Sequence, residues 1–74
     1  MEKKLLKKNY KLTAREKDIV RLIRECPTHQ AIADNLGISR GVVRNYINNL
    51  RKRFEVDSSI ALFFKVNELD LMEN

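Results

Sequence analysis

Three side chains that can hydrogen-bond to nucleic-acid bases stand close together in the 74-residue chain, namely Arg44, Asn45 and Asn48. On a helix each residue advances by about 100°, so these positions share the side opposite the apolar residues Val43 and Ile47. An arginine can donate two hydrogen bonds to guanine O6 and N7, and an asparagine can pair with adenine N6 and N7. The spacing therefore predicts that Arg44, Asn45 and Asn48 contact DNA bases.

Positive charge concentrates in the same segment of the chain. The formal net charge is +5, and residues 40–53 contain no acidic residue. Such a local field attracts the phosphates of a polyanion. We expect phosphate contacts from Ser39, directly before this segment, and from Arg40, Arg51, Lys52 and Arg53 within it.

Metal binding and catalysis find little support in the sequence. Cys26 and His29 are the only residues of their types, and a structural zinc site would need a second pair of ligands. No nucleophile has a base partner at a suitable spacing. We therefore expect no metal, no cofactor, no small-molecule substrate and no enzymatic activity. The single cysteine and the absence of a signal peptide or membrane span predict a cytoplasmic protein.

The apolar spacing predicts an all-α fold with four helices. Thr13 to Glu16 fits a capping box at the start of the first helix, and Pro27 ends that helix. The other helices are expected at about residues 28–36, 39–54 and 57–67, with fraying from residue 67 onward.

The second and third of these helices have the spacing of a helix-turn-helix. Ala33 is small where two helix backbones would cross, and Gly37 can adopt positive φ in the turn. Ile38 and Val43 would fill the angle between the helices. The pattern predicts a helix at residues 39–54 that enters the major groove of DNA.

The chain divides into a basic N-terminal arm, residues 1–11, and a helix-turn-helix domain, residues 12–74. The arm contains Lys3, Lys4, Lys7, Lys8 and Lys11. A solvated tail is the favoured interpretation, because runs of like charge repel one another, and an added phosphate contact is the alternative.

The fourth expected helix is too apolar for one face to bury. We predict that it forms a homodimer through Ile60, Phe63, Phe64 and Val66. The alternative is that Leu5, Leu6 or Tyr10 covers the same residues within one chain.

The chain resembles the LuxR/GerE-type DNA-binding domain from about residue 12 to residue 64. The resemblance rests on Leu-Thr-Ala-Arg-Glu at 12–16, Ile-Ala at 32–33, Leu-Gly-Ile-Ser at 36–39 and the segment 43–56. It implies four helices, base recognition by the third and dimerisation by the fourth. It further implies phosphate contacts from Thr28, His29 and Gln30, alongside Ser39 and residues near Arg51 and Arg53. The chain departs from the family pattern at Ala31, Val42, Tyr46 and Ser59.

The leading hypothesis is a sequence-specific regulator of transcription that binds double-stranded DNA as a homodimer, with RNA polymerase as a further candidate partner. Two alternatives remain open at this point. One is a protein-interaction module that sequesters a related regulator through the fourth helix. The other is a promoter-reading domain similar to that of a sigma factor.

Overall fold

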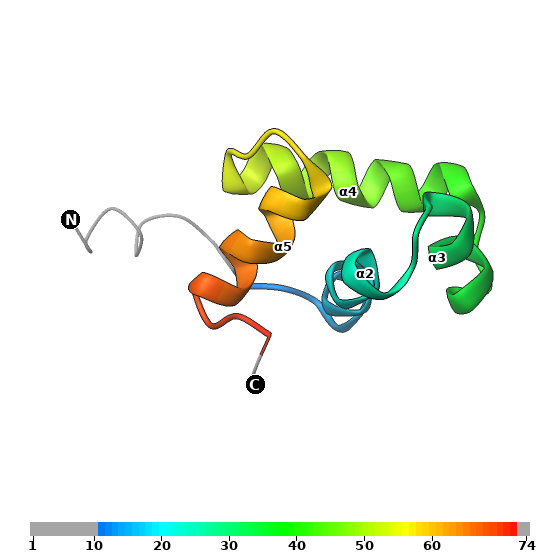
Figure 1. Ribbon diagram of the computed structural model, residues 1–74, viewed down its shortest axis with the longest axis horizontal. Coiled ribbons are helices and arrows are strands. Elements are labelled where there is room, and N and C mark those ends of the chain that lie inside the picture. Colours follow the sequence, from blue (N-terminus) through cyan, green and yellow to red (C-terminus); the bar gives the residue numbers. More distant parts are fainter. Residues whose placement is uncertain (1–10, 73–74) are drawn as a thin grey trace.

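The computed structural model describes residues 11–72, which form four α-helices and no strand (Figure 1). The helices are α2 (Ala14–Glu25), α3 (His29–Leu36), α4 (Arg40–Phe54) and α5 (Ser59–Glu68). The all-α prediction is confirmed, and each predicted boundary lies within two residues of the observed one. The predicted arm lies outside the described residues except for Lys11, as do Leu5, Leu6 and Tyr10. None of these four helices has the length and apolar character needed to cross a membrane.

A hydroxyl side chain begins each helix. The Thr13 hydroxyl accepts from the Glu16 N–H at 3.1 Å, and the Thr13 N–H donates to Glu16 Oε1 at 3.0 Å, which completes the predicted capping box. Thr28, Ser39 and Ser58 each accept a hydrogen bond from the backbone N–H three residues later. Each cap satisfies an otherwise unpaired N–H and contributes about 1 kcal/mol. The helix starts are therefore set by local sequence.

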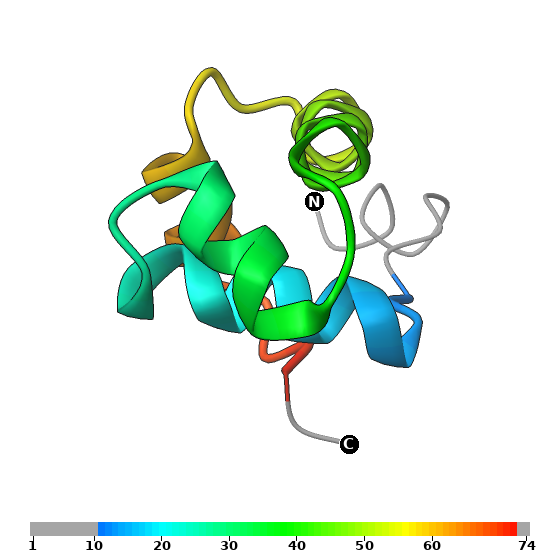
Figure 2. The same ribbon diagram turned by 90° about the vertical axis from the view of Figure 1, so that its right-hand side faces the viewer.

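The turn between α3 and α4 makes the helix-turn-helix. Gly37 adopts the left-handed conformation with φ of 70°, where a side chain would introduce strain, and the Ile38 N–H donates to the Ala33 carbonyl at 3.0 Å. Figure 2 looks nearly along α4 and shows α3 crossing it. Ala33 of α3 is fully buried.

The core is built around α4. This helix buries Val43, Ile47, Leu50 and Phe54 at spacings of four, three and four residues, and Figure 1 shows α2 and α5 packed beneath it. The remaining buried residues of the described chain are Ile19, Val20, Leu22, Ile32, Ala33, Leu62 and Val66. Because α4 buries one face in the core, its opposite face lies in solvent.

Two expectations about the C-terminal part need correction. Val66 was predicted to contact a partner, but its side chain is completely buried in the core of the single chain. Residues beyond 67 were predicted to fray, but α5 continues to Glu68, and Leu69, Leu71 and Met72 pack against the core. The Leu71 N–H also donates to the Val66 carbonyl at 3.1 Å, which holds the segment after α5 on the domain.

One ion pair joins the start of α2 to the end of α4. Arg53 Nη2 lies 2.9 Å from Glu16 Oε2, and Arg53 Nη1 donates to the Lys11 carbonyl at 3.1 Å. Partial burial raises the pKa of the Glu16 carboxyl. The hydrogen bond from the Thr13 N–H and the bond and charge of the Arg53 guanidinium lower this pKa by a larger amount, so it lies below the usual value of 4.5. The Glu16 side chain is only 13% exposed, which limits solvent screening of the pair.

Glu16→Gln should lower the free energy of unfolding by about 1–2 kcal/mol at pH 7, since glutamine keeps the capping box and loses the ion pair. The depressed pKa stabilises the fold above pH 4.5, and this contribution is lost as the pH falls through the folded-state pKa. Urea unfolding at pH 7 and pH 3 should therefore show a difference between wild type and variant that shrinks in acid. Arg53→Met is the matched control, and the double variant should lose little more than either single one. A difference that stays constant with pH would rule out the ion pair as its cause.

Candidate nucleic-acid interface

The solvent side of α4 carries the three predicted base-contacting residues. Arg44, Asn45 and Asn48 are all exposed, and together we call them the reading face. Gly41 lies one turn before Asn45, and a Cβ placed there would have only the Ser39 hydroxyl within 4 Å. The first turn of α4 therefore leaves room for a close approach by another molecule.

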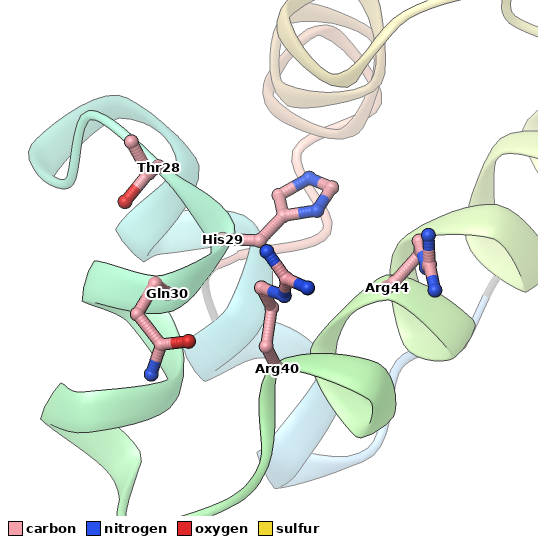
Figure 3. Close-up of a pocket in the computed structure, with 5 residues that line it drawn as sticks. All are labelled: Thr28, His29, Gln30, Arg40 and Arg44. Atoms are coloured by element: carbon pink, nitrogen blue, oxygen red, sulfur yellow. The ribbon is translucent and has the colours of Figure 1, made fainter.

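A first depression, of about 420 Å³, lies between the starts of α3 and α4 (Figure 3). It is lined by Thr28, His29, Gln30, Arg40 and Arg44. The structure thus brings four of the predicted phosphate-contacting residues together with one of the reading face. In Figure 3 the His29 ring and the Arg40 guanidinium point into the same space, with Arg44 across from them on α4.

The electrostatics of the first depression favour an anion. Arg40 and Arg44 are both exposed, and neither guanidinium is bonded to another group within residues 11–72. The N-terminus of α3 adds its partial positive charge. The lining contains no carboxylate, although the Gln30 amide donates to Asp34 Oδ1 at 2.9 Å along α3. A phosphate group would find donors and positive charge there.

A second depression, of about 490 Å³, lies at the other end of α4. Its lining includes Asn48, Arg51, Lys52, Glu55 and Asp57, so it carries both signs of charge. Arg51 does not extend freely into solvent, because its Nη2 donates to the Asp57 carbonyl at 2.6 Å. Lys52 is exposed beside it.

The basic residues 51–53 thus separate into three roles that the sequence did not distinguish. Arg53 is bound to Glu16 on the flank of α4 that faces α2, and it lies away from both depressions. Arg51 binds the turn before α5, and only Lys52 remains as an exposed cation. No short-range pattern signals the pairing of Arg53, because its partner Glu16 stands 37 positions away.

The exposed apolar residues of α5 form a patch on another part of the molecule. Ile60 is 46% exposed and Phe64 is 57% exposed, whereas Phe63 is half-buried. The guanidinium of Arg24 lies 5.6 Å from the centre of the Phe63 ring, and Phe63 meets Phe64 edge-on. Of the four residues predicted to dimerise, Ile60 and Phe64 are open to a partner and Phe63 is so in part.

Comparison with known proteins agrees with this architecture. The profile of the GerE family, described as bacterial regulatory proteins of the luxR family, matches residues 10–65. The transcriptional regulatory protein DesR of Bacillus subtilis (strain 168) is 35% identical over 57 residues, which are 77% of this chain and 29% of that protein. The chain thus spans less than a third of the length of that curated relative. No solved structure gives a significant match.

The match covers the helix-turn-helix, both depressions and most of α5. The family consists of DNA-binding regulators and not of enzymes, so the predicted fold class and the absence of enzymatic activity are confirmed. The chain belongs to the luxR family of bacterial regulatory proteins.

Proposed function

We propose that this chain binds double-stranded DNA in a sequence-specific manner, with α4 in the major groove, and thereby regulates transcription. The observation that carries the proposal is the position of Arg44, which belongs to the reading face and also lines the first depression. A phosphate held in that depression would place α4 beside the bases. The major groove is about 12 Å wide and admits a helix with its side chains.

The proposed base contacts come from the reading face, and the proposed phosphate contacts come from residues around it. Arg44, Asn45 and Asn48 supply donors and acceptors for base edges, which give sequence preference. The proposed phosphate contacts are Thr28, His29, Gln30, Ser39, Arg40 and Lys52. Arg53 is not among them because Glu16 neutralises it, and Arg51 is not because its Nη2 donates to the Asp57 carbonyl.

We further propose a homodimer through Ile60 and Phe64, with Phe63 at the edge of the contact. Two such chains related by a two-fold axis would present two copies of α4 to half-sites about 34–36 Å apart. The exposed fraction of Phe64 supports this proposal, because a large apolar side chain on a small domain gains free energy when a partner covers it. A cytoplasmic location and a contact with RNA polymerase would follow from the role in transcription.

The proposal is tested by selecting bound duplexes from a random pool at a series of salt concentrations. Wild type should enrich one motif, and its affinity should fall about 1,000-fold from about 50 mM to about 200 mM salt if about six phosphates are contacted. Arg44→Ala should cost about 1–3 kcal/mol of binding free energy and relax one base position.

Asn45→Ala and Asn48→Ala should each relax a different position of the motif. Unchanged sequence preference in all three variants would refute the assignment of the reading face. A chain that enriches no sequence but binds a related regulator through Phe64 would instead be a sequestering module.

A further inference from the structure

The Asn48 amide is held by a neighbouring arginine within the reading face. Arg51 Nη1 lies 3.4 Å from Asn48 Oδ1, one turn away on the same side of α4. No such bond reaches the Asn45 amide within residues 11–72. Two asparagines of the same reading face therefore present their amides under different constraints.

Arg51 is itself fixed by the backbone that follows α4. Its Nη2 donates to the Asp57 carbonyl at 2.6 Å, and the Val56 N–H donates to the Arg51 carbonyl at 3.0 Å. This close turn is made by Glu55, which adopts the left-handed conformation with φ of 60°. Arg51 Nε is buried and has no hydrogen-bond partner among the described residues. The guanidinium is thus drawn toward the protein and is poorly placed to contact a phosphate.

The chemistry of the guanidinium decides which way the amide faces. Arginine has five N–H donors and no acceptor, so it can bind only the oxygen of an asparagine amide. With Oδ1 turned toward Arg51, Asn48 Nδ2 and its two hydrogens are turned away from it. The bond thus turns the Asn48 N–H donors away from Arg51 and takes one of the two lone pairs of Oδ1.

We propose that Arg51 is a positioning residue that makes Asn48 select a base with acceptors in the major groove, guanine foremost. This inference rests on the proposed function, since it concerns the base that the reading face prefers. Guanine presents N7 and O6 side by side as acceptors. Pairing with adenine instead needs the amide oxygen to accept from N6, and Arg51 competes for that oxygen. Asn45 keeps both halves of its amide available for adenine.

The experiment is selection from a random duplex pool with the full chain, followed by sequencing. Asn48→Ala identifies the base position that Asn48 contacts. Arg51→Lys keeps the charge but lacks the planar fork that spans Asn48 and Asp57, and it should lower the guanine preference at that same position by about fivefold or more. Asn48→Asp keeps the size and the bond to Arg51 but has no N–H donor, so it should lose the guanine preference without Arg51 being changed.

Lys52→Met is the matched control, because Lys52 is the adjacent exposed cation. It should weaken binding to all sequences and lower the salt dependence while the motif stays the same. The inference is overturned if Arg51→Lys leaves the Asn48 position unchanged, or if the wild type prefers adenine there. Failure of the wild type to enrich any motif would instead refute the proposed function itself. Thermal unfolding of each variant separates loss of selectivity from loss of the fold.

Discussion

Replacing Arg40 and Arg44 together by glutamate should weaken DNA binding by at least about 1,000-fold at physiological salt while the domain stays folded. The two guanidinium groups contribute positive charge to the lining of the first depression. The substitutions would place two carboxylates where phosphates are proposed to lie. Coulomb repulsion then replaces attraction, and the counterions that binding would have released stay on the DNA. Fluorescence anisotropy with a labelled duplex measures this loss directly.

Stability should change little in this double variant. Both arginines are exposed and neither bonds to another group within residues 11–72, so the free energy of unfolding should stay within about 1 kcal/mol. Arg15→Glu with Arg21→Glu on α2 makes the same change in net charge at a different place. An equal loss of affinity in both double variants would show that total charge, and not the first depression, governs binding.

Ile60→Asp with Phe64→Asp should abolish dimerisation and lower the affinity for a two-half-site duplex by about 100- to 10,000-fold. A dimer binds its second half-site as an intramolecular event, and a monomer loses that gain. The same substitutions place carboxylates on the patch, where burial against a second copy would be costly. Sedimentation equilibrium reports the oligomeric state, and anisotropy on the same samples reports the affinity.

A duplex with a single half-site provides the control for this variant. Its affinity should be nearly unchanged, because α5 lies outside the reading face and the first depression. Persistence of the dimer in the variant would place the subunit contact elsewhere. A wild type that is monomeric even on DNA would leave Ile60 and Phe64 without the proposed role.

Local sequence signals are sufficient to predict the helices, their caps and the turn. Thr13, Thr28 and Ser39 bond to backbone groups only three residues away, and Gly37 needs no distant contact to adopt positive φ. The side of α4 that faces solvent was also predictable, because a period of 3.6 residues places Asn45 opposite Val43. All of these signals act within about one helical turn, so tertiary packing had only to agree with them.

Residues that look alike in the sequence acquire different roles when the helices pack together. Val66 and Phe64 are both apolar residues of α5, and only packing against α2 and α4 buried the first and left the second 57% exposed. Arg51 and Arg53 stand two residues apart, yet one holds Asn48 and the other pairs with Glu16. A side chain's free energy depends on the neighbours that folding brings to it. For Val66 these are α2 and α4, for Arg53 the Glu16 carboxylate of α2, and for Arg51 the Asp57 carbonyl in addition to Asn48 of its own helix.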